Sequence, residues 1–354
     1  MNNYREKKIK VLVVDDSFFM RRLLRELLSE DEEIEVVGEA RDGEEAVSMA
    51  EKWKPDVVTM DFNMPKLNGV EATRKLMHQA GPIPMVVMIS AYTKEGANET
   101  LQSLRAGAVD FITKPSGELS LDIKTIGEEI IRKIKVASGA RVRTFKDIKA
   151  QKRIKNTVLR APKTVVIIGA STGGPPVVED ILHALPGDLD VAVVVIQHMP
   201  KFFTETFARR LNEISGLPTH EAIPGEELKG GLIYLSPGNF HISFVKSTGD
   251  DLQPALYFAL TPEIPHTGLS SIDSAMNALA KYFPGKIIAV ELTGMGCDGL
   301  EGIAALKEVG AYIIVQDPTT AAVDSMPNAI IDAKFANVIL PPEKIPAKII
   351  ELCQ

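Results

Sequence analysis

The first half of the sequence places three carboxylates at the ends of apolar runs. Asp15 and Asp16 directly follow the run Val11–Val14. Asp61 follows the run Asp56–Met60. Clustered carboxylates without a countercharge repel one another, so they call for a hard divalent cation such as Mg²⁺. With Mg²⁺ bound, one carboxylate can act as a nucleophile toward a phosphoryl group.

Two further strand ends carry groups that fit this chemistry. Ser90 ends the run Met85–Ser90, and Lys114 follows the run Val109–Thr113. A hydroxyl and a lysine beside a phosphorylated carboxylate would stabilise and sense the added charge. The competing interpretation is that strand-end Asp and Ser residues only cap the helices that follow. Suitable residues at four strand ends favour a phosphorylation site over simple capping.

The second half contains a candidate nucleophile in a glycine-rich turn. Residues Gly169–Gly174 read Gly-Ala-Ser-Thr-Gly-Gly and follow the apolar run Val165–Ile168. They fit G-x-S-x-G, the turn between strand and helix that raises a serine above a sheet. Glycines suit such a turn because a Cβ would clash there. The pattern by itself leaves open whether Ser171 is a nucleophile or only caps the next helix.

A histidine and an acid at two other strand ends support the nucleophile. His198 comes after Val191–Ile196, and Asp298 lies in the loop after Ile287–Leu292. A histidine can take the proton of a serine, and an acid orients the histidine and stabilises its charged form. The order Ser, His, Asp differs from the order in the α/β-hydrolase fold, so we predict another fold. His241 is interpreted as structural rather than as part of a substrate rim.

The loop that carries Asp298 also supports a competing function. Gly294–Gly299 fits G-x-G-x-x-G after a strand, and Asp317 follows at close to the spacing of a ribose-binding acid. A nicotinamide-binding dehydrogenase is therefore an alternative. Against it, Asp298 would place a negative charge beside the pyrophosphate. That alternative also gives no role to Ser171 or His198.

The elements that position these groups alternate between strand and helix. Residues 8–130 contain five buried-type strands separated by helical patterns, which predicts a parallel doubly wound sheet. A second α/β pattern begins at Thr164. Between His220 and Pro262, short strands alternate with Pro-Gly turns and predict inserted antiparallel hairpins. The predicted fold class is α/β, with two doubly wound domains: an N-terminal five-stranded parallel sheet and a C-terminal parallel-sheet hydrolase with inserted antiparallel hairpins.

A stretch rich in Lys and Arg separates the two patterns. It predicts a domain at residues 1–130, a basic linker at 131–163 and a second domain at 164–354. A basic run can bind nucleic acid or a membrane, but a solvated linker is favoured here. A DNA-binding regulator is the corresponding alternative, and it would need a helix-turn-helix at the C-terminus. A long α/β pattern stands there instead.

Composition narrows the cellular setting. The net charge of −7 argues against nucleic acid as the main partner. Two cysteines, Cys297 and Cys353, cannot form a disulfide framework or a Cys-rich zinc site, which fits a reducing compartment. No apolar run approaches the roughly 18–20 residues needed to span a bilayer. We expect a cytoplasmic monomer that neither inserts into a membrane nor binds nucleic acid.

With these motifs, residues 8–130 resemble the response-regulator receiver family. The resemblance implies that Asp61, in Met-Asp-Phe-Asn-Met-Pro, accepts the phosphoryl group. It implies that Asp15, Asp16 and Asp61 hold Mg²⁺ together with the carbonyl of Asn63. A cytoplasmic histidine kinase is the implied phosphodonor.

The same resemblance assigns a switch to three other residues. Ser90 and Lys114 would contact the phosphate, and Phe111 would be the aromatic side chain that changes rotamer. We expect the unphosphorylated receiver to cover the Ser171 cleft. Phosphorylation of Asp61 would then shift the population toward an open arrangement.

The spaced set Gly-Ala-Ser-Thr-Gly-Gly, Gln-His-Met and Thr-Gly-Met-Gly-Cys-Asp-Gly resembles the chemotaxis protein-glutamate methylesterase family. The resemblance implies that Ser171 is the nucleophile, His198 the general base and Asp298 its orienting acid. It also implies that the Met295 N–H stabilises the oxyanion and that Thr172 positions His198. No cofactor is implied for this domain.

The activity that this resemblance implies is hydrolysis of glutamate methyl esters on methyl-accepting chemotaxis receptors, with release of methanol. This reaction belongs to sensory adaptation, and the receiver would activate it on phosphorylation. Deamidation of receptor glutamines is implied as well. An amide has the poorer leaving group, so we expect the deamidase reaction to be slower.

Overall fold

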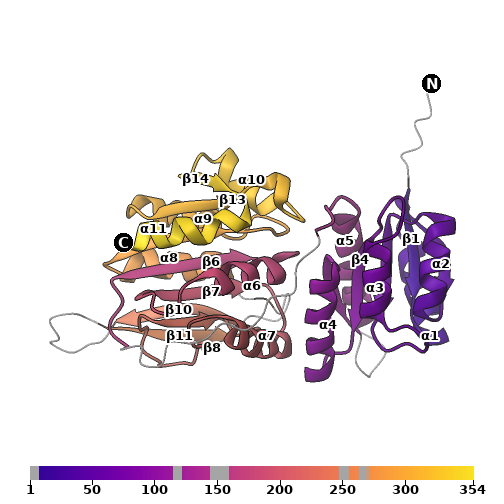
Figure 1. Ribbon diagram of the computed structural model, residues 1–354, viewed down its shortest axis with the longest axis horizontal. Helices are drawn as coiled ribbons and strands as arrows, with labels where there is room; N and C mark the ends of the chain where they lie inside the picture. Colours follow the sequence, from indigo (N-terminus) through magenta and orange to yellow (C-terminus); the bar gives the residue numbers. More distant parts are fainter. Residues whose placement is uncertain (1–7, 115–121, 144–158, 247–254, 263–268, 270) are drawn as a thin grey trace. The chain divides into compact units, whose positions relative to one another are not determined.

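The structure, a computed structural model, describes residues 8–114, 122–143, 159–246, 255–262, 269 and 271–354. The chain separates into an N-terminal unit, Met1–Lys146, and a C-terminal unit, Asp147–Gln354. Figure 1 shows both units as sheets with helices packed on them. Within the described ranges, no helix is long and apolar enough to cross a membrane.

The N-terminal unit is built on a five-stranded parallel sheet in the order β2-β1-β3-β4-β5. The strands other than the edge strand β2 are largely apolar and buried, as in a sheet covered on both faces. The chain reverses its direction of travel across the sheet between β1 and β3, and such a reversal opens a crevice at the carboxyl ends of the strands. The strands are β1 (Ile9–Val14), β2 (Ile34–Ala40), β3 (Val57–Asp61), β4 (Met85–Ser90) and β5 (Asp110–Thr113).

Short polar side chains fix where the helices of this unit begin. Ser17, Asp42, Asn68 and Thr93 each accept a hydrogen bond from a backbone N–H in the first turn of the next helix. Such N-caps satisfy donors that the helix itself leaves free. The helices are α1 (Phe18–Ser29), α2 (Gly43–Trp53), α3 (Gly69–Met77), α4 (Lys94–Ala106) and α5 (Asp122–Ser138).

Helix α5 extends beyond residue 130, the predicted end of the first domain. Its residues Ile134 and Ala137 are buried in the core cluster that also contains α1 side chains. The basic residues on either side of Ile134, Lys133 and Lys135, pair with carboxylates of the same unit. The beginning of the predicted linker is therefore part of this helix. Residues 144–158, most of the remaining linker, lie outside the described residues.

The C-terminal unit contains a seven-stranded parallel sheet in the order β14-β13-β12-β6-β7-β9-β8. From β6 the chain first builds outward through β7, and it later returns to add β12, β13 and β14 on the other side. The reversal of direction therefore lies between β6 and β12. The strands are β6 (Thr164–Ala170), β7 (Ala192–Gln197), β8 (Thr219–Glu221), β9 (Leu232–Leu235), β12 (Lys286–Glu291), β13 (Tyr312–Gln316) and β14 (Val338–Leu340).

One antiparallel hairpin, formed by β10 (Phe240–Lys246) and β11 (Leu256–Pro262), stands outside this sheet. Antiparallel hairpins were expected throughout residues 220–262, and this pair confirms part of that expectation. By contrast, β8 and β9 join the main sheet as parallel strands. Short strands with turns between them do not reveal which neighbour they pair with, so the sequence could not separate the two arrangements.

Helices and the hairpin complete the core of the C-terminal unit. Ile242 and Phe258 of the hairpin share a buried cluster with Met276 and Leu279 of α8. This packing places the hairpin against α8, a helix that contributes directly to the site described below. The helices are α6 (Gly174–Ala184), α7 (Lys201–Ile214), α8 (Ile272–Tyr282), α9 (Leu300–Glu308), α10 (Ser325–Asp332) and α11 (Ile345–Cys353), with short 3₁₀ turns η1 (Pro318–Thr320) and η2 (Pro342–Lys344).

Candidate functional site

Ser171 lies in the turn that joins β6 to α6. Its N–H donates to the carbonyl of Thr293 at 3.0 Å, and its own carbonyl accepts from Gly174 N–H at 2.9 Å. These bonds tie the turn to the loop after β12. The left-handed residue of the turn is Gly173, with φ of 75°, and Ser171 itself does not have a positive φ. The glycine thus takes the conformation that a side chain would disfavour.

His198 lies at the end of β7, next to Ser171 across the sheet. Its N–H donates to Ala170 O at 3.0 Å, which sets the position of its backbone. Its side-chain Nδ1 is 3.1 Å from Ser171 Oγ, and its Nε2 is 2.8 Å from Asp298 Oδ2. For Nδ1 to accept the serine proton, the neutral ring must carry its proton on Nε2. Asp298 accepts that proton's hydrogen bond and so holds the productive tautomer.

Asp298 is held by the N-terminus of α8 as well as by His198. Its carboxylate accepts from Ile272 N–H at 2.8 Å, from Asp273 N–H at 3.0 Å and from Ser271 Oγ at 3.2 Å. A helix N-terminus favours an anion because its first N–H groups lack partners within the helix. Burial acts to raise the pKa of Asp298. The hydrogen bond and charge of His198, with the two backbone donors, hold that pKa well below its usual range.

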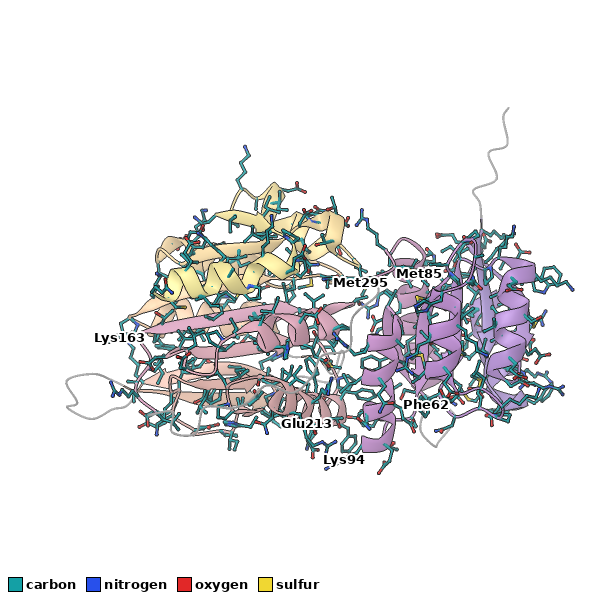
Figure 2. The ribbon with its side chains drawn as sticks, viewed as in Figure 1. Phe62, Met85, Lys94, Lys163, Glu213 and Met295 are labelled. Carbon is teal, nitrogen blue, oxygen red and sulfur yellow. The ribbon has the colours of Figure 1, made fainter. Side chains whose placement is uncertain are left out.

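The loop after β12 packs against the turn that carries Ser171. Thr293 anchors this loop, because its Oγ1 donates to Thr172 O at 3.0 Å and its N–H donates to Gln316 Oε1 at 2.8 Å. In the part of the chain that the structure describes, the Met295 N–H has no hydrogen-bond partner. In Figure 2, Met295 lies at the end of the C-terminal unit's sheet opposite to Lys163, the residue just before β6. Thr172 itself is buried.

Two more carboxyl groups lie near Asp298, and sequence reasoning missed both. Asp273 accepts from the N–H groups of Gly299 and Gly302, and burial with the nearby charge of Asp298 raises the pKa of Asp273 to about 6. Glu291 is fully buried at the end of β12, and both of its oxygens lack partners among the described residues. Burial, then the charges of Asp298 and Asp273, raise the pKa of Glu291 well above its ordinary value.

The residues of the alternative dinucleotide motif are used in other ways. In the Gly294–Gly299 loop, Asp298 is bound to His198 and to α8, as described above. Asp317 is the N-cap of η1, and its side chain accepts from Thr319 N–H at 2.9 Å. The loop is therefore organised around a carboxylate rather than around an anionic ligand. This arrangement does not support the dehydrogenase alternative.

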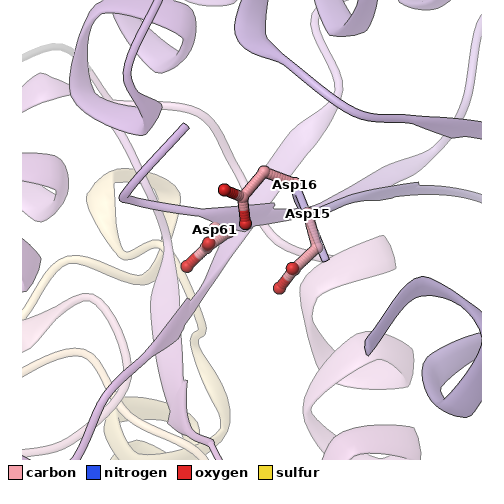
Figure 3. Close-up of side chains that lie close together, drawn as sticks. All are labelled: Asp15, Asp16 and Asp61. Atoms are coloured by element: carbon pink, nitrogen blue, oxygen red, sulfur yellow. The ribbon is translucent and has the colours of Figure 1, made fainter. Parts of the chain in front are cut away.

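The N-terminal unit brings its predicted acidic residues together. One oxygen each of Asp15, Asp16 and Asp61 lies within 4.8 Å of the others, and Figure 3 shows the three carboxylates around one point. Lys114 Nζ is 2.9 Å from Asp15 and 2.9 Å from Asp61. An all-oxygen donor set of this kind fits Mg²⁺. Asn63, whose carbonyl was predicted to join it, lies exposed in the loop after β3.

Burial dominates the electrostatics of this pocket. Asp61 is buried, and this burial, together with the charge of Asp15, raises the pKa of Asp61 to about 6 although Lys114 opposes the change. Burial acts to lower the pKa of Lys114, but the hydrogen bonds and charges of the two carboxylates outweigh it and raise that pKa. Negative charge is therefore in excess here, and a cation would relieve it.

The two remaining switch residues are both buried. Ser90 Oγ donates to Gly96 O at 3.0 Å, so the hydroxyl is tied to the first turn of α4. Phe111 lies in β5, and Lys133 Nζ is 5.2 Å from the centre of its ring. Lys133 Nζ also donates to Phe111 O at 2.6 Å. The lysine of α5 therefore contacts both the ring and the backbone of the predicted switch residue.

Comparison with known families divides the chain into the same two parts. Residues 166–349 match the family model of the CheB methylesterase. Residues 11–124 match the model of the response regulator receiver domain. The first segment includes Ser171, His198 and Asp298, and the second includes the acidic pocket.

Individual relatives match over nearly the full length. A protein-glutamate methylesterase/protein-glutamine glutaminase of Pyrococcus horikoshii is 40% identical over 353 residues, covering 98% of this chain and 94% of the relative. The protein of the same name from Thermotoga maritima is 40% identical over 347 residues, covering 98% and 99%. The crystal structure of the Thermotoga maritima CheB methylesterase catalytic domain matches with a TM-score of 0.50 and 38% identity, covering 55% of this chain and 100% of that one.

Proposed function

This chain belongs to the CheB methylesterase family and carries a response regulator receiver domain, and on that premise we propose its reaction and its catalytic residues. The reaction is hydrolysis of glutamate methyl esters on chemotaxis receptors, which yields a glutamate side chain and methanol. One observation carries the assignment of the residues. His198 bridges Ser171 Oγ at 3.1 Å and Asp298 Oδ2 at 2.8 Å.

The first half of the reaction forms an acyl-enzyme. His198 Nδ1 takes the proton of Ser171 while Oγ attacks the ester carbonyl carbon. The Met295 N–H stabilises the oxyanion, and such a donor contributes roughly 3–4 kcal/mol in other serine hydrolases. The tetrahedral intermediate then collapses, the bond to the methoxy oxygen breaks, and His198 returns the proton to release methanol. Thr172 helps to place His198 beside the nucleophile.

The second half releases the receptor side chain. Water loses a proton to His198 and attacks the acyl carbon, the bond to Ser171 Oγ breaks, and the serine recovers its proton. Asp298 stabilises the imidazolium in both halves because it keeps its charge. A glutamine side chain enters the same sequence with ammonia as the leaving group. Deamidation is the second activity and the slower one, because an amide nitrogen leaves less readily than methoxide.

The N-terminal unit supplies the control in this proposal. Asp61 accepts a phosphoryl group from a chemotaxis histidine kinase. Asp15, Asp16 and Asp61, with the Asn63 carbonyl, would hold Mg²⁺. Lys114 and Ser90 then contact the phosphate, and the change reaches Phe111 in β5. Bound Mg²⁺ supplies charge neutralisation during the transfer. The chain's own contribution is the buried position of Asp61, which excludes water from the phosphorylated side chain.

The cellular setting follows from the same family. We assign the N-terminal unit, through the end of α5 at Ser138, to control and residues 164–354 to catalysis, with the linker between them. The protein acts as a cytoplasmic monomer on receptor segments exposed to the cytoplasm. The unphosphorylated control domain inhibits hydrolysis at Ser171, and phosphorylation relieves this inhibition. Such a shift requires the phosphate to stabilise one state more than the other.

The test is release of methanol from methylated receptor by the full chain. We expect the wild type to release methanol and Ser171→Ala to release none, because the nucleophile is lost. Thr204→Ala removes another hydroxyl of the same unit, at the start of α7, and is the matched control. Absence of methanol release from the wild type, with or without acetyl phosphate and Mg²⁺, would overturn the proposed function.

A further inference from the structure

A second histidine, His241, is bonded to the structure that holds Asp298. It lies in β10, on the hairpin outside the main sheet, and its side chain is partly buried. Its Nδ1 atom is 3.0 Å from the backbone N of Ser271. Because a backbone N–H can only donate, Nδ1 must be the accepting, unprotonated nitrogen of the ring. The ring therefore supplies an acceptor at a defined position.

The residue that receives this bond is the N-cap of α8. Ser271 Oγ accepts from Ser274 N–H at 3.2 Å and lies 3.2 Å from Asp298 Oδ1, to which it donates. The next two residues, Ile272 and Asp273, donate their N–H groups to the same carboxylate. The segment Ser271–Asp273 thus provides three of the hydrogen bonds to Asp298. Its position determines where the carboxylate lies relative to His198.

His241 replaces the second half of a capping box. In that motif a Glu or Gln at the third helical position reaches back to the N–H of the N-cap residue. The third position of α8 is Ser274, whose short hydroxyl instead lies 3.3 Å from Ile242 O. The N–H of Ser271 is satisfied from outside the helix, by His241. Strand β10 therefore contacts the first turn of α8 through two neighbouring residues.

We propose that His241 is a positioning residue for the hydrolysis, acting through Ser271 on Asp298. By accepting the Ser271 N–H, it fixes the first turn of α8, and this turn holds Asp298 in line with His198. The proposal rests on the proposed function, because it takes Ser171, His198 and Asp298 as the catalytic groups. His241 touches neither the nucleophile nor the general base in this arrangement.

The proposal makes a kinetic prediction that separates positioning from substrate contact. Without the acceptor, the first turn of α8 frays and Asp298 loses its fixed orientation, so the chemical step slows. A small misplacement of a catalytic group can lower a rate by about 10- to 100-fold. We expect kcat to fall by this amount while KM for methylated receptor stays unchanged. A residue on the substrate rim would instead raise KM.

Three variants of the full chain test the role of one atom. His241→Leu removes the acceptor and keeps an apolar side chain of similar size. His241→Asn places its Oδ1 where Nδ1 was and restores the acceptor. His241→Gln carries its amide one bond further out and misses that position. We expect Leu and Gln to lower kcat alike, and Asn to retain it to within about threefold, since the three hydrogen bonds from Ser271–Asp273 to Asp298 then persist.

A spectroscopic readout tests the same link without turnover. His198 donates Nε2–H to Asp298, and we expect a low-field proton resonance from this bond in protein labelled with ¹⁵N-histidine. The resonance should persist in His241→Asn and broaden or shift in His241→Leu. If the wild type released no methanol, the proposed function would fail, and this resonance would still test the link from His241 to Asp298.

Several outcomes would overturn the proposal. These are an unchanged kcat in His241→Leu, a rise in KM in place of the fall in kcat, or an Asn variant as impaired as the Leu variant. A resonance of His198 that is identical in all variants would do the same. Thermal unfolding of each variant sets the assay temperature below its transition, so that loss of folded protein does not lower the measured kcat.

Discussion

At the scale of single residues, Asp298 joins more of the catalytic site than any other side chain described above. It receives His198 on one side and the N-terminus of α8 on the other. Its oxygens only accept hydrogen bonds, and every group bonded to them donates. The site therefore requires an ionised carboxylate at this position, and the low pKa of Asp298 ensures it.

Replacing this carboxylate by an amide should disable the base. In Asp298→Asn, the amide NH₂ would donate to His198 Nε2, which would move the ring proton to Nδ1. The Nδ1 that faces Ser171 could then no longer accept its proton. We expect kcat for methanol release to fall by about 10³- to 10⁴-fold, as when the acid of a related triad is changed to Asn. A loss of less than tenfold would contradict this assignment.

Glu291 gives the folded state a pH dependence of its own. The pKa of this buried carboxyl is raised above its unfolded value, so the folded state keeps a proton that the unfolded state releases. Stability should therefore fall as pH rises above the unfolded pKa near 4.5, and keep falling until the folded pKa is passed. Asp273, with a pKa raised to about 6, acts in the same direction.

The variant Glu291→Gln removes this titration and keeps the shape of the side chain. We expect its stability relative to the wild type to be greater at pH 8 than at pH 5, because only the wild type releases a proton at this position on unfolding, and a higher pH favours that release. The measurement is the free energy of unfolding by denaturant at both pH values. Glu301→Gln, on an exposed position of α9, is the control. An identical pH dependence for Glu291→Gln and wild type would refute the prediction.

At the scale of elements, the sequence predicted where the strands end better than which other elements pack around those ends. Apolar runs marked β1, β3, β6, β7 and β12, and the polar residue after each run fell at the carboxyl edge of a parallel sheet, as the geometry requires. The role of α8 could not be predicted. Ser271 has the signal of a helix cap, but Asp298, the anion bound there, is distant in sequence and arrives only through tertiary packing.

The burial of Glu291 and the parallel pairing of β8 and β9 could not be predicted for the same reason. A glutamate within an otherwise apolar strand indicates an exposed position as readily as a buried one. Only the structure shows it wedged near Gly169 and Gly299, where an added Cβ would lie 2.8 Å from a carboxyl oxygen. Strand pairing in the predicted hairpin region likewise depends on long-range contacts. Local patterns specify strands, but they do not specify their neighbours.

The loop after β12 approaches Ser171 so closely at Gly294 that there is no room for a side chain at this position. A Cβ added there would overlap the side chain of Met326 and lie 2.7 Å from Ser171 Cβ. The Met326 side chain can move, but Ser171 Cβ is fixed to the turn. We expect Gly294→Ala to displace Ser171 and lower kcat by at least about tenfold. Gly139→Ala is the control for a glycine substitution, because an added Cβ there would lie 3.8 Å from the nearest non-adjacent atom of the described residues, Val136 O.

At the scale of the whole molecule, each unit has a core of its own. The two buried clusters share no residue, one lying around β1 and α5 and the other around β6 and α8. A fragment of residues 159–354 keeps the hydrogen bonds that Gly230 N–H donates to Arg160 O and that Lys286 N–H donates to Lys163 O. We expect this fragment to fold and to release methanol at a rate that acetyl phosphate does not change. A fragment that unfolds or stays inactive would show that catalysis depends on the N-terminal unit.

Control by phosphorylation can be tested as a ratio, methanol release with acetyl phosphate and Mg²⁺ divided by release without them. We expect a ratio on the order of ten for the full wild-type chain, since coupling between sites is typically worth about 1–3 kcal/mol. In Asp61→Asn the ratio should fall to one because the phosphoacceptor is gone. Asp31 lies just before β2, at the end of the N-terminal unit's sheet opposite to Asp61. Asp31→Asn is therefore the control, and it should keep the ratio of the wild type.

Removing the metal separates phosphoryl transfer in the N-terminal unit from hydrolysis at Ser171. Chelation by EDTA should bring the wild-type ratio to one, because the acidic pocket then lacks the cation that neutralises Asp15, Asp16 and Asp61 during phosphoryl transfer. The rate without acetyl phosphate should not change, because His198, held by Asp298, takes the proton of Ser171 without a metal. A fall in the unstimulated rate would mean that the hydrolytic site itself needs a metal. A ratio that survives chelation would place the phosphorylation chemistry elsewhere in the chain.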